Sequence, residues 1–409
     1  MHEWFNTPPR RCLRLLPLLT LLLGLPFAGL LLSRNPVAPY FDFPPTTSFL
    51  EHAPFSWAHF LAFGLVDAAL LGILLYLAIP NTPPPPLHQE SPHWSFPWWG
   101  WVGLIGLVIF WILAWSRFSW FTPWQTLTFT PLWIAFILVV NGLTYRRTGT
   151  CLLQNRPQFV AALFGGSALF WWYFEYLNRF VQNWYYHGIE SFSSFQYVFH
   201  STLAFSTVLP AVLSTYEYLT TFPQLRCRAI IRPFHLPASR TLAWITLLTA
   251  SGGLFGISLW PDILFPLLWV APLLMMLSWQ HLVQESTLLS DLPRRGWRVV
   301  VLPAFAALIC GIFWEMWNAY SEAHWVYSLP YVHAFKLFEM PLLGYGGYLP
   351  FGLECLVVID VITQTCGFRP FHPPDHLHTP PISANSPGQK KMNQALFIQA
   401  GKRHGTSRY

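Results

Sequence analysis

The sequence predicts an all-α, polytopic membrane protein with a transmembrane helical bundle, and three observations support this fold class. Of the 409 residues, 54% are hydrophobic and only 10% are charged. A soluble chain carries about a quarter charged residues. Apolar stretches of about 20 residues, the length that crosses a bilayer as a helix, recur along the chain. These stretches lack the alternation of apolar and polar residues that marks a transmembrane barrel.

We predict about ten transmembrane helices, because each one needs about 20 predominantly apolar residues. They are expected at residues 13–33, 57–79, 98–115, 128–145, 158–180, 195–219, 241–260, 263–282, 299–320 and 342–362.

The arginine residues predict how these helices are oriented. Short loops rich in Lys and Arg stay in the cytoplasm. If the N-terminus is inside, alternate loops and the basic tail hold nearly all of these residues. We therefore expect a multi-pass protein of the bacterial cytoplasmic (inner) membrane with both termini in the cytoplasm. The cytoplasmic arginines before the tail are Arg10, Arg11, Arg14, Arg146, Arg147, Arg156, Arg226, Arg228, Arg232, Arg240, Arg294, Arg295 and Arg298.

The first helix has to be distinguished from a secretory signal, which also places basic residues before an apolar run. Here the apolar core is long, and the following "GLLLSRNP" lacks a small-x-small cleavage site. We therefore expect an uncleaved membrane anchor.

The chain divides into five predicted segments. Residues 1–79 form an N-terminal two-helix hairpin, and residues 80–97, with the stretch "PNTPPPPLHQESPH", form a stiff Pro-rich cytoplasmic linker. Residues 98–220 and 221–366 form two membrane repeats. Residues 367–409 form a disordered, basic cytoplasmic tail.

The two repeats share a sequence element. The stretch "FEYLNRFVQNWYY" around Glu175 matches "WEMWNAYSEAHWVY" around Glu315, since both contain E-x-x-N-x-aromatic followed by W-x-Y. An Arg-Arg loop precedes each unit. We infer a duplicated four-helix unit. Because four is an even number of spans, the two copies share one orientation, and their pseudo-twofold axis is expected along the membrane normal.

Each element places a polar stripe on an apolar helix. Glu175, Asn178 and Arg179 lie at helical spacing, and Glu315 and Asn318 repeat the pattern. Such stripes avoid lipid by facing the interior of the bundle. We expect both stripes to meet in a central cavity near the outer face, with an ion pair between Glu175 and Arg179.

These stripes and the neighbouring aromatic residues supply the candidate site. The candidate catalytic residues are the carboxylates Glu175, Glu315, Glu339 and Glu354. The candidate substrate-binding residues are Asn178, Arg179, Asn318, Trp171, Trp172, Trp314, Trp317, Tyr186 and Tyr327.

Two structural alternatives stay open for these residues. Trp and Tyr gather at membrane interfaces, so a belt at the outer face would also explain Trp184, Tyr185, Tyr186, Trp325 and Tyr327. Buried polar side chains also hold transmembrane helices together. The Glu and Asn side chains would then form a clasp between the two copies.

Several classes of site have no motif in this chain. It contains no G-x-x-x-x-G-K-[ST] or G-x-G-x-x-G phosphate loop, no H-E-x-x-H and no G-x-S-x-G. We predict no metal and no cofactor. The six cysteines include no C-x-x-C pair, so no disulfide framework is expected. Basic residues are spread over separate loops, which favours membrane lipids as partners and disfavours nucleic acid. The oligomeric state stays unknown.

The stretches "FWWYFEYLNRFVQNWYY" and "FEMPLLGYGGYLPFGLE" resemble a group of uncharacterised bacterial polytopic membrane proteins, from about Trp98 to Asp360. That resemblance implies no activity. Membrane carboxylates beside aromatic residues are also loosely similar to multi-pass carotenoid cyclases and hydratases, although the Pro-x-Glu-Glu signature of those enzymes is missing.

Three classes of function remain. The first is an enzyme that acts by acid–base chemistry on a lipid or isoprenoid. The second is a transporter or channel component for a small solute. The third is a membrane assembly or scaffold protein.

Overall fold

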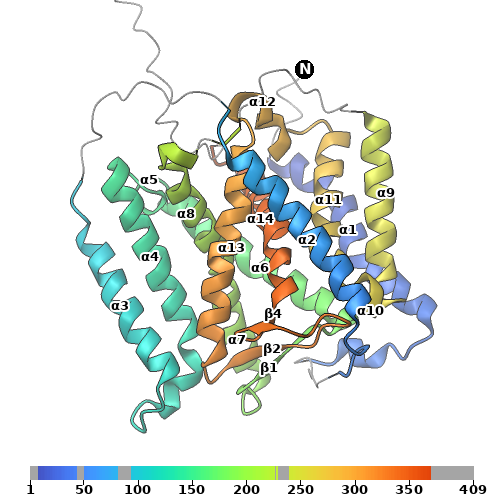
Figure 1. Cartoon of the computed structure of the whole chain (residues 1–409), viewed down its shortest axis with the longest axis horizontal. Coiled ribbons are helices and arrows are strands. Elements are labelled where there is room, and N and C mark those ends of the chain that lie inside the picture. Colours follow the sequence, from blue (N-terminus) through green and yellow to red (C-terminus); the bar gives the residue numbers. More distant parts are fainter. Residues whose placement is uncertain (1–7, 44–49, 82–93, 226, 229–238, 370–409) are drawn as a thin grey trace, which may run out of the picture. The chain divides into compact units, whose positions relative to one another are not determined.

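The computed structural model describes residues 8–43, 50–81, 94–225, 227–228 and 239–369, which are mostly helical (Figure 1). Long runs of Leu, Ile, Val and Phe form helices here, because a helix satisfies its own backbone groups without polar neighbours. Most of the predicted Pro-rich linker and almost all of the predicted tail lie outside the described residues.

Helices account for most of the described chain. The α-helices are α1 (Pro8–Ser33), α2 (Trp57–Ala78), α3 (Trp98–Trp115), α4 (Phe129–Thr148), α5 (Leu152–Asn155), α6 (Pro157–Val181), α7 (Ser194–Phe205), α8 (Val208–Thr220), α9 (Arg240–Gly256), α10 (Pro261–Leu264), α11 (Leu267–Leu282), α12 (Leu292–Arg295), α13 (Arg298–Ala319) and α14 (Tyr348–Thr365). The 3-10 helices are η2 (Ala38–Phe41), η3 (Thr122–Leu127), η4 (Pro223–Leu225), η5 (Leu288–Asp291) and η6 (Leu342–Gly347).

Among the described residues, seven helical segments are long and apolar enough to cross a membrane. This is compatible with an integral membrane protein. The other three predicted spans correspond to α6, which carries the polar stripe, and to α9 and α11, which have 17 and 16 residues. The prediction of about ten spans therefore stays a prediction. The seven segments are Leu13–Ser33, Trp57–Ala78, Trp98–Trp115, Phe129–Thr148, Ser194–Thr220, Arg298–Ala319 and Leu342–Thr365.

Two predicted helices are interrupted. The span expected at residues 195–219 bends between α7 and α8, just before Val208. The last span begins as the 3-10 helix η6 over its Gly-rich stretch and continues as α14. Glycine also permits close packing here, because a Cβ at Gly352 would collide with the carbonyl oxygen of Pro303 in α13.

Equivalent helices of the two predicted repeats have equivalent neighbours. Helix α3 packs on α4, and α9 packs on α11. Helix α8 packs on α4 and α6, and α14 packs on α11 and α13. Across the two halves, α13 packs on α8 and α6 packs on α14. The same pattern of contacts thus occurs twice in the molecule.

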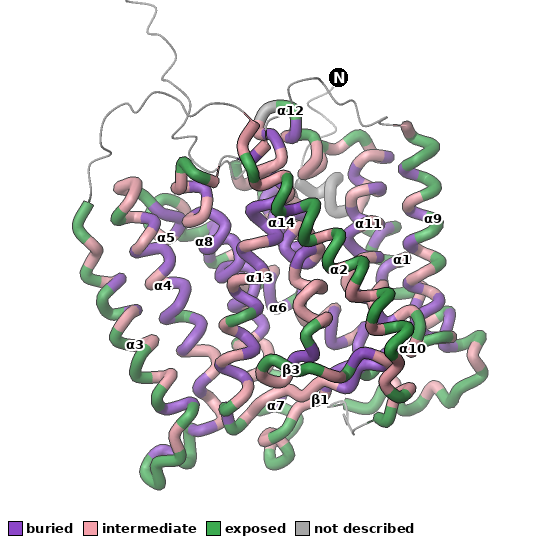
Figure 2. Tube along the Cα trace, in the orientation of Figure 1, coloured by how far each residue is buried: buried purple, intermediate pink, exposed green. Residues whose placement is uncertain are grey.

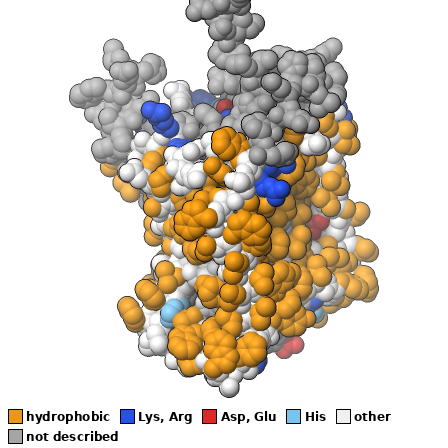
Figure 3. Space-filling model, turned by 90° about the vertical axis from the view of Figure 1, so that its left-hand side faces the viewer, with side chains coloured by type: hydrophobic (Ala, Val, Ile, Leu, Met, Phe, Trp, Pro, Cys, Tyr) orange, Lys and Arg blue, Asp and Glu red, His pale blue; other side chains and the backbone are white. Residues whose placement is uncertain are grey.

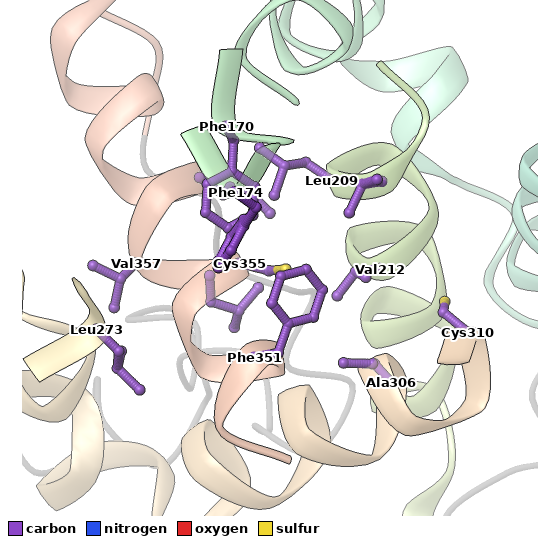
Figure 4. Close-up of a cluster of buried hydrophobic side chains, with 14 of the residues drawn as sticks. Phe170, Phe174, Leu209, Val212, Leu273, Ala306, Cys310, Phe351, Cys355 and Val357 are labelled. Carbon is purple, nitrogen blue, oxygen red and sulfur yellow. The ribbon is translucent and has the colours of Figure 1, made fainter. Parts of the chain in front are cut away.

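The core lies where α6, α8, α11, α13 and α14 meet. Figure 2 shows buried residues concentrated in the central helices, whereas α2, α3 and α9 are exposed along their outer sides. The face in Figure 3 is covered mostly by hydrophobic side chains, as expected for a surface in contact with lipid. Figure 4 shows buried side chains of this core, including Phe170, Phe174, Leu209, Val212, Leu273, Ala306, Cys310, Phe351, Cys355 and Val357.

Short strands close one end of the bundle, opposite the end that carries α5 and α12 (Figure 1). Strand β1 (Trp184–His187) pairs antiparallel with β2 (His324–Tyr327), so that Trp184 faces Tyr327 and Tyr186 faces Trp325. A second hairpin consists of β3 (Lys336–Leu337) and β4 (Met340–Pro341). The sequence analysis expected an all-α bundle and did not anticipate these short strands, which both W-x-Y elements form.

Candidate functional site

The chain leaves α6 by a sharp turn that positions the first W-x-Y element. Gln182 adopts a left-handed conformation with φ of 49° and ends the helix. The Asn178 side chain then holds the turn, because its Oδ1 accepts from the Asn183 backbone N–H at 2.8 Å and its Nδ2 donates to the Trp184 carbonyl at 2.7 Å. Asn178 thereby starts strand β1.

Asn318 has the same role after α13. Its Nδ2 donates to the Trp325 carbonyl at 2.7 Å, and its Oδ1 accepts from the Trp325 backbone N–H at 2.8 Å. Both asparagines were predicted to bind substrate. Neither is among the residues that line the cavity described below, and the amides of both are hydrogen-bonded to the backbone. In the structure they stabilise turns, and their role in binding stays a prediction.

We call residues 175–186 the first cassette and residues 315–327 the second cassette. In the first cassette, a single carboxylate oxygen gathers the aromatic donors. Glu175 is buried in α6, and its Oε1 accepts three hydrogen bonds. The donors are Trp171 Nε1 at 3.2 Å, Trp184 Nε1 at 3.1 Å and the Tyr186 hydroxyl at 2.6 Å.

In the second cassette, two tyrosine hydroxyls donate to the acid. Glu315 is fully buried, and its Oε1 accepts from the hydroxyls of Tyr327 and Tyr348, each at 2.8 Å. Trp325 Nε1 donates to the Tyr327 hydroxyl at 2.9 Å. The second oxygen of Glu315, Oε2, is buried without a hydrogen-bond partner among the described residues.

A glycine explains why Tyr348 enters the second cassette. Gly311 stands four residues before Glu315, as Trp171 stands four residues before Glu175. A Cβ at Gly311 would overlap the Tyr348 ring, so the ring of Tyr348 occupies the space above this glycine. A tyrosine from α14 therefore replaces an indole donor.

Both cassettes border one cavity of about 420 Å³ at the β1–β2 end of the bundle. Trp171, Trp184 and Tyr186 contribute from the first cassette's side. The remaining wall comes mainly from α2, α7, α11, η6 and the first turn of α14, with Phe129 of α4, Val208 of α8 and the second cassette's side. The lining residues from that second side include Trp314, His324, Trp325 and Tyr327.

The ionisable side chains that line this cavity are Asp67, His200, His324 and the tyrosines. Among the described residues, no Lys or Arg lines it, and its carboxylate is Asp67 of α2. Burial, followed by the nearby carboxylates, raises the pKa of the Tyr186 and Tyr327 hydroxyls well above the ordinary value. Both tyrosines therefore stay protonated and act as donors. The described residues contain no group of three His, Cys, Asp or Glu side chains that would hold a metal.

The predicted ion pair between Glu175 and Arg179 does not form. Arg179 instead donates from Nη1 to the carbonyl oxygens of Tyr40 at 2.6 Å and Asp42 at 3.0 Å. Helical spacing places both side chains on one side of α6, but the Glu175 oxygen is already surrounded by indole and phenol donors. The longer Arg179 side chain turns toward the segment that follows α1.

Glu175 and Glu315 lie behind their aromatic donors and are not among the lining residues, and four other predicted residues also lie outside the lining. Trp172 donates to Thr202 of α7 at 3.0 Å, and Trp317 is buried among aromatic rings of α3, α4 and α13. The remaining two are carboxylates. Glu339 pairs with Lys336 at 3.7 Å, and Glu354 is buried in α14 with neither carboxylate oxygen hydrogen-bonded in the described part of the chain.

The belt interpretation is also wrong for most of the residues that suggested it. Trp184 is buried, and Tyr186, Trp325 and Tyr327 face the cavity. Their strands cross the end of the bundle and turn alternate side chains inward.

The sequence analysis missed several residues of the site. Tyr348, Trp269 and Asn183 line the cavity without belonging to either polar stripe. Gly311 in the place of a tryptophan was the available signal for Tyr348. No protein-family model matches the chain, and no curated protein or solved structure is similar to it.

Proposed function

We propose that the protein is an integral membrane enzyme that acts by acid–base chemistry on a lipid or isoprenoid held in the outer half of the membrane. One observation carries this proposal. A single aromatic cavity is lined by residues of both cassettes, and tyrosine hydroxyls that line it donate to the buried Glu175 and Glu315.

The cavity wall supports an apolar substrate. Most of its lining is aliphatic or aromatic, as in most small-molecule sites. Val66 of α2 lines the cavity and is 63% exposed. We therefore place the mouth of the cavity beside α2.

Glu315 is the better candidate for the proton-exchanging acid. Its Oε2 is buried without a partner, and the neutral acid with its proton on that oxygen suits such a place best. Its two neighbours are tyrosines, and a hydroxyl can donate one proton while it accepts another. Two of the three donors to Glu175 are indoles, which only donate. Glu175 therefore acts mainly as an anchor for aromatic side chains.

Transport and assembly remain the alternative functions, and transport is the weaker of the two on geometry. A solute pathway needs polar groups along the whole depth of the bundle. Helices α8 and α14 contribute to the cavity lining only from their first turns, at Val208, Tyr348, Pro350 and Phe351. Beyond them lies the apolar core of Figure 4. A blind cavity of this kind suits an enzyme.

The finer architecture belongs to the same proposal. We propose ten spans with a duplicated four-helix unit, in a bacterial inner membrane with both termini cytoplasmic. The equivalent helix contacts, the equivalent Asn-supported turns and the antiparallel pairing of β1 with β2 support the duplication.

The test compares two matched substitutions, Glu315→Gln and Glu175→Gln. Lipid extracts from cells that express each variant are compared by mass spectrometry with extracts from cells that express the wild type. We expect a lipid product in the wild type that is lost in Glu315→Gln, since the amide keeps the shape but exchanges no proton at neutral pH. Glu175→Gln should retain most of this product.

Folding of both variants is checked by thermal unfolding in detergent. If a folded Glu315→Gln protein yields the same lipids as the wild type, Glu315 is not the acid. If expression of the wild-type protein changes no lipid in the extracts, the enzymatic proposal fails and the assembly function is favoured.

A further inference from the structure

Asn183 presents an unpaired amide to the cavity. Its side chain is 1% exposed and lines the cavity, and neither Oδ1 nor Nδ2 has a hydrogen-bond partner among the described residues. Such groups are rare in native proteins, because each one forfeits the hydrogen bonds that it makes in water.

The backbone of Asn183, in contrast, is firmly held. Its N–H donates to Asn178 Oδ1 at 2.8 Å, and its carbonyl accepts from the Ser328 N–H at 2.8 Å. These bonds tie the residue to Asn178 of the first cassette and to Ser328, the residue directly after the second cassette. The protein therefore fixes the position of this amide and leaves its donor and its acceptor available.

Trp314 adds a second unpaired donor to the same cavity. Its ring lines the wall, and its Nε1 is buried without a partner among the described residues. The described lining contains no Lys or Arg, so it holds no permanently charged group that would neutralise a phosphate or a carboxylate; His200 and His324 also line the cavity and carry a positive charge only when protonated. The available groups fit an uncharged head that both donates and accepts.

We propose that the ligand of this cavity is a lipid alcohol, whose hydroxyl pairs with the Asn183 amide while its apolar body lies against the aromatic wall. A hydroxyl offers one donor and two acceptor lone pairs, which complements the asparagine acceptor and its donor and leaves a lone pair for Trp314. This inference rests on the proposed function, since it names the substrate class of the same cavity.

The test uses three probes that are brominated along a long alkyl chain and differ only at the end: an alcohol, an alkane and a carboxylate. Binding to the full-length protein in detergent is followed by quenching of tryptophan fluorescence, since Trp171, Trp184, Trp269, Trp314 and Trp325 line the cavity. We expect the alcohol to bind at least about tenfold more tightly than the alkane, because a site with unpaired polar groups discriminates against a ligand that leaves them unpaired. The carboxylate should bind no better than the alkane.

Asn183→Leu should remove the preference for the alcohol and leave alkane binding unchanged. Asn155→Leu, in α5 at the other end of the bundle, is the matched control and should bind as the wild type does. If Asn183→Leu does not fold, Trp314→Phe provides the test instead, since it removes the Nε1–H donor and keeps an aromatic ring at this position. It should weaken alcohol binding severalfold without changing alkane binding.

The outcomes separate this inference from the proposed function. Equal quenching by the alcohol and the alkane would show that water, and not the ligand, hydrogen-bonds to the Asn183 amide. The lipid-alcohol proposal would then be wrong, whereas the proposal of a lipid-binding cavity would stand. A preference that survives in both variants would also overturn the lipid-alcohol proposal. If no probe quenches the wild type more than it quenches free tryptophan in the same detergent, the lipid cavity itself is wrong.

Discussion

At the scale of single residues, the two glutamates resemble each other in sequence and differ in their surroundings. Glu175 accepts from two indoles and one phenol, whereas Glu315 accepts from two phenols and has one oxygen without a partner in the described chain. The exchange of Trp171 for Gly311 accounts for this difference, since it admits Tyr348. The difference at this one position thus explains why Glu175 acts as an acceptor for aromatic donors whereas Glu315 is the candidate proton donor.

We predict that Glu175→Ala destabilises the protein strongly. Trp171, Trp184 and Tyr186 would lose their common acceptor, and each buried donor without a partner costs about 1–3 kcal/mol. Water that enters the vacated space offsets part of this loss, so the free energy of unfolding should fall by roughly 2–5 kcal/mol.

Thermal unfolding in detergent measures the effect. Glu190→Ala is the control, because Glu190 is an exposed carboxylate in the loop after β1, and its removal should leave the unfolding temperature unchanged. Equal unfolding temperatures for Glu175→Ala and the control would mean that the three aromatic donors find other acceptors.

At the scale of elements, β1 and β2 join the two halves of the molecule at the end of the bundle where the cavity lies. Their register is nearly symmetric, since Tyr185 and Val326 face each other at the centre and each Trp faces the Tyr of the other strand. An Asn from the preceding helix sets the start of each strand. This pairing places four aromatic side chains beside the two acids.

The register can be tested with cysteines at Tyr185 and Val326. Residues directly opposite in an antiparallel pair have Cβ atoms about 4.5–5.5 Å apart, close to the separation in a disulfide. We expect oxidation to cross-link this pair in a protein with Cys366 replaced by Ser. A protease site placed between residues 229 and 238 reveals the cross-link, because the cleaved halves stay together without reductant.

The control pair has cysteines at Tyr185 and Tyr327, which are offset by one residue and point to opposite faces of the sheet. It should form little cross-link. Preferential cross-linking of the control would require a register shifted by one residue.

Helix α2 is the element that borders the mouth of the cavity. We predict that Val66→Trp slows entry of a lipid probe, because the larger ring would fill the space where Val66 is both exposed and part of the lining. Leu65→Trp is the matched control, since Leu65 is 71% exposed and does not line the cavity. The rate of tryptophan quenching by the brominated alcohol measures entry. Equal rates in the two variants would place the mouth elsewhere.

At the scale of the whole molecule, two sets of helices repeat the same contacts around a shared core. Helices α8 and α14 occupy equivalent central positions, and each packs on both halves. The cavity lies at the end where the two halves are joined by strands. A duplicated bundle with parallel copies places equivalent side chains on opposite sides of a common axis. The equivalent bonds from the cavity-lining Tyr186 to Glu175 and from Tyr327 to Glu315 fit this arrangement.

The orientation predicted from the arginine distribution can be tested with reporter tags. Tags after Tyr409 and in the linker at Leu87 should report the cytoplasm, and a tag near Ile189 should report the outside, because loops rich in Lys and Arg stay in the cytoplasm. A C-terminal tag that reports the outside would contradict an even number of spans.

The sequence by itself determined the class of fold, because a chain with few charges and repeated apolar stretches has no other way to satisfy its backbone in lipid. It also identified Glu175 and Glu315 as matched positions, since helical periodicity and internal similarity are local properties of the chain. Trp171, Trp314, Tyr186 and Tyr327 were likewise predicted as ligand-binding residues, and they line the cavity.

Only the tertiary structure decided which side chains meet. Helical spacing tells which face of α6 carries Arg179, but not that Tyr40 and Asp42 would offer their carbonyl groups to it. The positions of Tyr348 and Asn183 depend on contacts between segments far apart in the chain, or on a turn held by another side chain. Packing between helices sets these distances, and no pattern within one helix encodes them.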